Sequence, residues 1–177
     1  MKLRTQIYSY PQGFTLIELL VVIVIIGIIA TIATFYFGDR IQQARTDALA
    51  KELAMILPLA EEEAMLRPAQ IGLVLTQQRY AFVEFNPNNQ SWTSLTDAKA
   101  FSGRAIPDSI ELDLQVNGNS IHLSSTATQS PQIIFYSSGN LTPFVIQIGL
   151  QNQAPDYQVI GQASGEVTLV HLQQPNN

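Results

Sequence analysis

One acidic residue stands where a carboxylate is costly to place. Glu18 immediately precedes the run Leu19–Gly38, which has twenty residues and no charged side chain. A helix rises about 1.5 Å per residue, so this run extends about 30 Å, the thickness of a membrane's hydrocarbon core. A carboxylate at the border of a membrane span costs free energy unless it has a partner, and such a residue commonly has a function. A Gly13-Phe14 pair lies a few residues before Glu18. The first candidates for a functional role are therefore Gly13, Phe14 and Glu18.

No other group of residues predicts catalysis or ligand binding. The histidines, His122 and His171, lack a third ligand at metal-binding spacing, and no serine stands in a Gly-x-Ser-x-Gly context. Glycines occur singly, without the glycine-rich run that cradles a phosphate. Asp108, Glu111 and Asp113 could contribute to a calcium site, but strand alternation alone would also place such acids on a solvated face. The sequence therefore predicts no catalytic residue, no metal site and no cofactor, and we expect no enzyme.

Composition narrows the class of protein further. The chain has 177 residues, of which 13% are charged, and a formal net charge of −5. This balance argues against a nonspecific nucleic-acid surface, which needs clustered Lys and Arg. The chain has no cysteine, so disulfides, thiolate metal sites and a cysteine nucleophile are excluded. Its length suits one domain and a long helix.

Two ordinary explanations of the N-terminus fit poorly. A conventional secretory signal has a shorter apolar core with an Ala-x-Ala cleavage site directly after it, whereas this run is longer and no such site directly follows it. A plain membrane anchor would explain the length of the run but not the motif before it. Lys2 and Arg4 should stay cytoplasmic, which would place everything after Gly38 on the far side of the membrane.

Eight consecutive residues resemble the class III signal of the type IV pilin superfamily: Gly13-Phe14-Thr15-Leu16-Ile17-Glu18-Leu19-Leu20. The resemblance implies that a prepilin peptidase cuts after Gly13, that Phe14 is N-methylated, and that the apolar helix stays in the mature protein. It also implies that Glu18 pairs with the N-terminal amine of an adjacent subunit during filament assembly. Pairing with its own amine, or extension of Glu18 to the lipid headgroups, are the alternatives.

Periodicity predicts the elements behind this motif. From residue 14 to about 67 the pattern is helical, first apolar throughout and then amphipathic, until Arg67-Pro68 ends it. From residue 71 onward, alternation predicts about eight strands. The clearest strand is Ile110–Val116, which an Asn117-Gly118 turn connects to Ile121 and Leu123.

Eight segments of the C-terminal part carry a second resemblance: Glu63–Arg67, Ile71–Leu73, Arg79–Phe85, Trp92–Leu95, Ile106-Pro107, Ile110–Leu112, Phe135–Phe144 and Gly165–Val167. They resemble the H-type minor pseudopilins of type II secretion systems (GspH-like). This resemblance implies an α+β fold, in which a long N-terminal helix packs on an antiparallel β domain of two sheets. It divides the chain into a cleaved leader at 1–13, a transmembrane helix half at 14–38, an amphipathic helix half at 39–67 and a periplasmic β domain at 68–177.

The same resemblance implies a function as a minor pseudopilin. Such a chain is a structural subunit of the periplasmic pseudopilus, which helps to drive folded proteins through an outer-membrane channel. Its implied partners are other pseudopilins (major and minor), the prepilin peptidase, the inner-membrane assembly platform and the lipid bilayer. Its implied place is the bacterial inner membrane, as a single-pass protein with a cytoplasmic N-terminus and a periplasmic C-terminal domain.

Two alternatives stay open. Minor pilins of type IV pili (the FimT/FimU group) share much of this domain, and they prime assembly or, in some FimT-like proteins, bind DNA through basic C-terminal surfaces. No Lys or Arg follows Arg104 here, so we expect no nucleic-acid partner. The second alternative is a membrane-anchored binding module whose β domain captures a ligand. A binding module would work with any anchor, whereas filament assembly requires Phe14 and Glu18.

Overall fold

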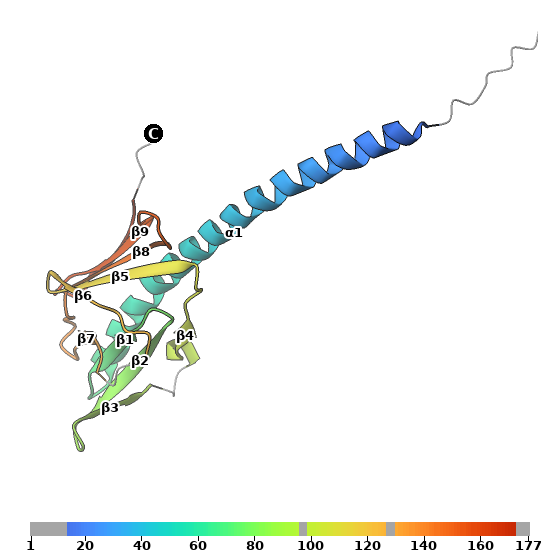
Figure 1. Ribbon diagram of the computed structural model, residues 1–177. Coiled ribbons are helices and arrows are strands. Elements are labelled where there is room, and N and C mark those ends of the chain that lie inside the picture. Colours follow the sequence, from blue (N-terminus) through green and yellow to red (C-terminus); the bar gives the residue numbers. More distant parts are fainter. Residues whose placement is uncertain (1–13, 96–98, 127–129, 173–177) are drawn as a thin grey trace, which may run out of the picture. The chain divides into compact units, whose positions relative to one another are not determined.

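The computed structural model describes residues 14–95, 99–126 and 130–172, without the side chains of residues 32–39 (Figure 1). One long helix precedes a β region, with a short 3₁₀ turn, η1 (Lys99–Phe101), within it. The β region has ten strands among the described residues. They are β1 (Ile71–Leu75), β2 (Arg79–Asn86), β3 (Ser91–Ser94), β4 (Arg104–Ala105), β5 (Ile110–Val116), β6 (Asn119–Ile121), β7 (Ile133–Phe135), β8 (Phe144–Leu150), β9 (Tyr157–Gly161) and β10 (Val167–His171).

The helix, α1, runs from Leu16 to Leu66 and continues through Pro58. It begins where Thr15 accepts a hydrogen bond from the Glu18 backbone N–H at 3.3 Å, the arrangement of an N-terminal cap. It ends before Arg67-Pro68, as the sequence predicted, because the residue before a proline avoids helical dihedrals.

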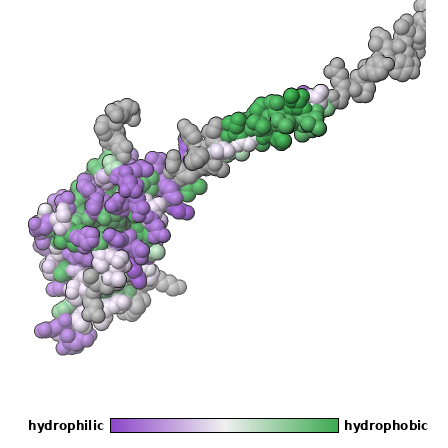
Figure 2. Space-filling model, viewed as in Figure 1, coloured by the Kyte–Doolittle hydropathy of each residue, from purple (hydrophilic) through white to green (hydrophobic). Residues whose placement is uncertain are grey.

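The chain divides into two compact units, Met1–Arg40 and Ile41–Asn177. In the first unit, every described side chain from residue 14 to residue 31 is exposed, and most are large and apolar (Figure 2). In the part of the chain that the structure describes, no helix is at once long and apolar enough to cross a membrane. The predicted span Leu19–Gly38 includes residues 32–38, whose side chains lie outside that part.

In the second unit, one antiparallel sheet has the strand order β3-β2-β1-β7, with β4 also paired to β2; we call it sheet A. Its central strand, β1, is buried at all five residues. Ile71, Leu73 and Leu75 belong to the main core cluster, whereas Gly72 lies against Trp92 and Pro131. Burial on both faces explains why β1 is an unbroken apolar run rather than an alternating one.

The other antiparallel sheet, sheet B, has the order β10-β9-β8-β5-β6. In β5, buried and exposed residues alternate from Ile110 to Leu114, as the sequence predicted. The predicted Asn117-Gly118 turn joins β5 to β6, and both of its residues have positive φ (51° and 78°). Two consecutive residues with positive φ match the twist of a tight hairpin, which Asn-Gly adopts at little cost.

The core lies between the second part of α1 and the two sheets. A single cluster of buried apolar side chains joins all three, so the α+β prediction with two antiparallel sheets is confirmed. A three- and four-residue spacing brings the helical members onto one face. These members are Leu49, Ala50, Leu53, Ile56, Leu57, Ala60 and Ala64.

The sequence predicted about eight strands, fewer than the described residues contain. The strand β4 has only two residues, both exposed, so it offers no alternation that a sequence pattern could detect. The strand after the Asn117-Gly118 turn is shorter than its pattern indicated, since β6 ends at Ile121 and Leu123 lies beyond it.

Candidate functional site

The N-terminal motif lies at the first turn of α1. Gly13 is outside the described residues. Phe14 precedes the helix and is 78% exposed, and Glu18 is the acidic residue of the first helical turn. A negative charge there interacts favourably with the unpaired N–H groups of a helix N-terminus. The structure therefore presents Phe14 and Glu18 one turn apart at an accessible helix start.

Thr15 and the backbone N–H of Glu18 also form part of a helix cap, which lies outside the sequence predictions. Thr15-Leu16-Ile17-Glu18 fits the Thr-x-x-Glu pattern of a capping box, in which the first and fourth residues satisfy the N–H groups at the start of a helix. The structure shows one half of this arrangement, the bond from the Glu18 N–H to the Thr15 hydroxyl. A test of Glu18 must therefore separate its charge from its place in the cap.

Four of the remaining candidate residues line one groove, and His171 lies elsewhere. His122 lines a groove beside β5, together with Asp108, Glu111 and Asp113. His171 instead stacks on Tyr157 at the edge of sheet B, with ring centroids 4.8 Å apart. Across the described ranges, no group of three or more His, Cys, Asp and Glu residues has the geometry to hold a metal ion.

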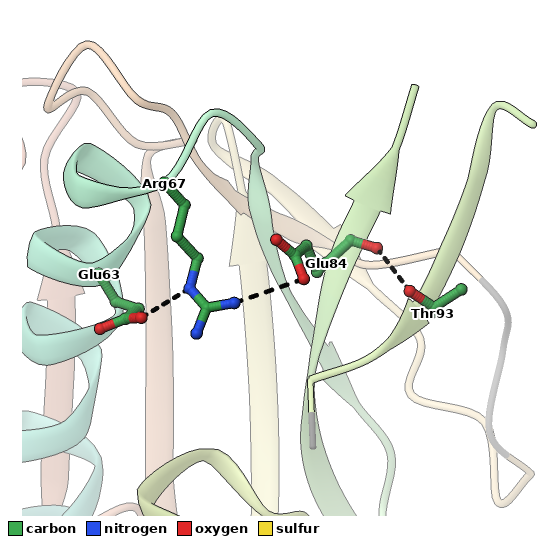
Figure 3. A network of polar contacts seen from close by, with 4 residues as sticks. All are labelled: Glu63, Arg67, Glu84 and Thr93. Carbon is green, nitrogen blue, oxygen red and sulfur yellow. Dashed lines mark hydrogen bonds and ion pairs between the residues drawn. The ribbon is translucent and has the colours of Figure 1, made fainter. Parts of the chain in front are cut away.

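Polar contacts join the end of α1 to sheet A (Figure 3). The Arg67 guanidinium donates from Nε to Glu63 at 2.6 Å, and its Nη1 lies 3.5 Å from the Glu84 carboxylate on β2. These two carboxylates, Glu63 foremost, raise the pKa of Arg67 above its ordinary value. Thr93 on β3 donates to the Glu84 carbonyl at 3.4 Å. These contacts thus connect α1, β2 and β3 around the point where the helix ends.

Two tyrosines connect the sheets to carboxylates on α1. The buried Tyr80 of sheet A donates its hydroxyl to Glu52, which also accepts from Arg104 at 2.6 Å. Burial, and then the Glu52 carboxylate, raise the pKa of Tyr80. In sheet B, the half-buried Tyr157 donates to Asp47 at 3.1 Å. A hydrogen bond from Lys51, and then one from Tyr157, hold the pKa of Asp47 below its ordinary value.

Comparisons with known proteins assign the chain to a family. Residues 9–34 match the model of the prokaryotic N-terminal methylation motif, and residues 49–165 match the model of the type II transport protein GspH. The chain belongs to the GspH family. The first match covers Phe14, Glu18 and the start of α1, and the second runs from the buried part of α1 to the turn between β9 and β10.

Relatives of this GspH-family chain agree with that assignment. It is 25% identical to the type II secretion system protein H of Aeromonas hydrophila over 155 residues, which cover 82% of this chain and 85% of the relative. It is 27% identical to the protein of the same name from Pseudomonas aeruginosa over 170 residues, which cover 92% and 95%.

Solved structures confirm the fold. The crystal structure of the minor pseudopilin EpsH from the type II secretion system of Vibrio cholerae matches with a TM-score of 0.64 and 23% identity, covering 75% of this chain and 98% of that one. The solution structure of Escherichia coli GspH matches with a TM-score of 0.57 and 17% identity, covering 72% and 89%. At these identities the likeness concerns the fold alone.

Proposed function

We propose that this GspH-family chain is a minor pseudopilin, a structural subunit of the periplasmic pseudopilus of a type II secretion system. The observation that carries the proposal is the succession of two family matches on one chain. A methylation motif opens an exposed apolar helix, and a GspH region covers the β domain that follows. Its partners are other pseudopilins, and its role is structural rather than enzymatic.

We propose that a prepilin peptidase removes residues 1–13 and that Phe14 is then N-methylated. Glycine before the cut leaves the backbone accessible to the peptidase, and Phe14 becomes the first residue of the mature chain. The Gly13→Leu variant should stay uncleaved while still bound to the membrane. The measurement is the intact mass of the purified chain, and loss of residues 1–13 from the variant would contradict the proposed cleavage.

The exposed apolar side chains of residues 16–31 support a membrane-stored subunit. We propose residues 14–38 as the transmembrane half of α1, 39–67 as its amphipathic half and 68–177 as the periplasmic domain, with the N-terminus cytoplasmic. In water such a surface is unfavourable at about 25 cal/mol per Å², so lipid or neighbouring helices must cover it. The chain would exchange lipid for other pseudopilins when the inner-membrane assembly platform moves it into the filament.

Glu18 carries the sharpest test of this proposal. The amine of a mature N-terminus is positive, and pairing with the Glu18 carboxylate of a neighbour would reward correct axial register, since the low dielectric of an apolar surrounding strengthens the contact. Glu18→Gln removes the charge but keeps a residue that suits a capping box. Thr15→Ala is the matched control, because it removes the cap and keeps the charge.

We expect the Glu18→Gln chain to be inserted and cleaved, yet to lose crosslinks to partner pseudopilins and to abolish secretion. Thr15→Ala should keep both. Normal crosslinks and secretion with Glu18→Gln would refute the pairing. Loss of function in Thr15→Ala alone would show that the helix cap, not the charge, is what assembly requires.

A second experiment separates a filament subunit from a tethered binding module. We would replace the first forty residues by an unrelated transmembrane helix and measure secretion. A binding module would keep its function with any anchor, whereas a pseudopilin would lose it. The family matches and the names of the relatives favour secretion over the FimT/FimU-type alternative.

A further inference from the structure

The strand β5 has a neighbour along only part of one edge. On one side, β8 pairs with it over its whole length, from Ile110 to Val116. On the other side, β6 pairs only with Leu114–Val116, because β6 ends at Ile121, which lies opposite Leu114. Among the described strands, the first half of β5, Ile110–Asp113, therefore has a partner on one side only (Figure 1).

The hydrogen-bond pattern shows which backbone groups face this open edge. The carbonyl of Ser109 accepts from the Gln151 N–H at 3.0 Å, and the Asn117 N–H donates to the Pro143 carbonyl at 2.9 Å. Backbone groups alternate sides along a strand, so the odd-numbered residues of β5 bond toward β8. The N–H and carbonyl of Leu112 consequently point the other way, toward the open edge.

A groove of about 510 Å³ lies along this edge. It forms because the chain turns away from β5 after Ile121, and the Ser124 carbonyl accepts instead from the Gln77 N–H of the β1–β2 turn, at 3.1 Å. Leu112, His122 and Gln77 are among the residues that line the groove. The lining thus combines the unpaired part of β5 with side chains that can form hydrogen bonds.

A comparable edge, at the end of β1, is covered by a side chain of the same protein. Immediately before β7 begins, the side-chain amide of Gln132 accepts from the Leu75 N–H at 2.9 Å and donates to the Leu75 carbonyl at 3.1 Å. This amide replaces a missing strand at the end of β1. Leu112 receives no such cover from any described side chain. Folded proteins ordinarily block exposed strand edges, because the unpaired backbone groups there can pair with another chain. The open edge of β5, which lies beside a groove, can therefore accept another strand.

The groove also has a charge preference. Asp108, Glu111 and Asp113 lie among its lining residues, and no lysine or arginine does. Glu111 and Asp113 are exposed residues of β5 and alternate with the buried Leu112. A segment that pairs with β5 would run past both carboxylates, which favours basic side chains on it.

We propose that this groove binds an extended segment of another polypeptide chain that carries lysine or arginine, which adds to β5 as a strand. Backbone hydrogen bonds to Leu112 would supply affinity, and the carboxylates at the rim would select the partner by charge. The proposal stands on the geometry of sheet B and does not depend on the chain being a pseudopilin.

Amide hydrogen exchange of the full chain in detergent micelles tests the open edge directly. In the free chain, the Leu112 amide should exchange faster than the amides of Glu111 and Asp113, which bond toward β8. The probe is an end-blocked peptide of about six residues, the length of a common strand, with alternating threonine and lysine. Its addition should slow exchange at Leu112.

Two further peptides and two variants complete the test. The threonine–glutamate counterpart should bind more weakly, and the lysine peptide with every backbone amide N-methylated should not bind. Asp113→Lys should lower the affinity for the lysine peptide about tenfold, as expected for reversing one rim charge. The control is Glu166→Lys, which reverses the charge of another exposed acid, on the turn between β9 and β10, and should leave the affinity unchanged.

Four results would overturn the proposal. Leu112 could exchange as slowly as its neighbours in the free chain, or the acidic peptide could bind as tightly as the basic one. The N-methylated peptide could bind undiminished, which would exclude strand pairing. Protection of Leu112 that grows with protein concentration and without peptide would identify a second copy of this chain as the occupant.

Discussion

Removing one hydroxyl should measure how strongly α1 is held to sheet A. Tyr80 is fully buried, and its hydroxyl donates to the Glu52 carboxylate on α1. A hydrogen bond to a charged group contributes about 1.5–3 kcal/mol when it is shielded from water. Tyr80→Phe keeps the ring and its packing, and it leaves Glu52 paired with Arg104 at 2.6 Å. We therefore expect the free energy of unfolding to fall by about 2 kcal/mol.

The matched control is Tyr157→Phe. This hydroxyl also donates to a carboxylate of α1, that of Asp47 at 3.1 Å, but both residues are half-buried and water can replace the bond. The loss there should be smaller than in Tyr80→Phe, because water competes with a solvated polar contact. The contrast between the two variants thus isolates the effect of burial.

The assay is urea unfolding of the full chain in detergent, followed by the fluorescence of Trp92, the one tryptophan of the sequence. Trp92 lies in β3 and packs against Phe85 of β2, so its emission reports on sheet A. With a slope of about 2 kcal/mol per M, Tyr80→Phe should lower the midpoint by about 1 M urea. An unchanged midpoint, or an equal shift in Tyr157→Phe, would refute the reasoning.

Four further outcomes follow from the structure. The pKa of Tyr80 is raised above its ordinary value of 10.0 in the folded state. Above pH 10 the unfolded state therefore loses the hydroxyl proton while the folded state keeps it, which lowers stability as the pH rises. The urea midpoint should consequently fall more steeply with pH in wild type than in Tyr80→Phe. Gly161→Ala should destabilise by about 1–3 kcal/mol, because its new methyl group would overlap the ring of Phe144. Gln132→Ala removes two hydrogen bonds at the edge of β1 and should cost about 1–3 kcal/mol in the same assay. Residues 41–177 alone should fold and give a circular dichroism spectrum dominated by β structure, and a largely helical spectrum would contradict the division into two units.

Local patterns in the sequence predicted the elements well. Alternation placed β5, the Asn117-Gly118 pair placed its turn, and Arg67-Pro68 placed the end of α1. Each is a signal confined to a few neighbouring residues, because periodicity and turn chemistry depend on the local backbone.

Contacts between distant residues could not be predicted in the same way. The bonds of Gln132 to Leu75 join residues 57 positions apart, and the contact of Tyr80 with Glu52 joins residues 28 apart. Neither residue type marks its partner in the sequence, since a surface glutamine and a helical glutamate look ordinary until the sheets are assembled.

The N-terminal site shows the same limit in another form. A resemblance identified Gly13, Phe14 and Glu18, and their roles stay predictions. The Thr15-x-x-Glu18 pattern of a helix cap was visible in the sequence and was missed. The groove beside β5 had no sequence signal, because it depends on where β6 stops rather than on any motif.

The order in which the strands enter the two sheets constrains how this chain can reach its folded state. Sheet A takes β1–β4, the chain then starts sheet B with β5 and β6, and it returns to sheet A with β7 before β8, β9 and β10 complete sheet B. Neither sheet can be completed early, because β1 pairs with β7 and β5 pairs with β8, and both partners come late in the chain. Such long loop closures slow folding, because chain entropy is lost before the distant contacts form. A chain emerging N-terminus first would therefore keep one open edge on β1 and on β5 until its last third arrives, so a chaperone that shields these edges during that interval should raise the yield of folded protein.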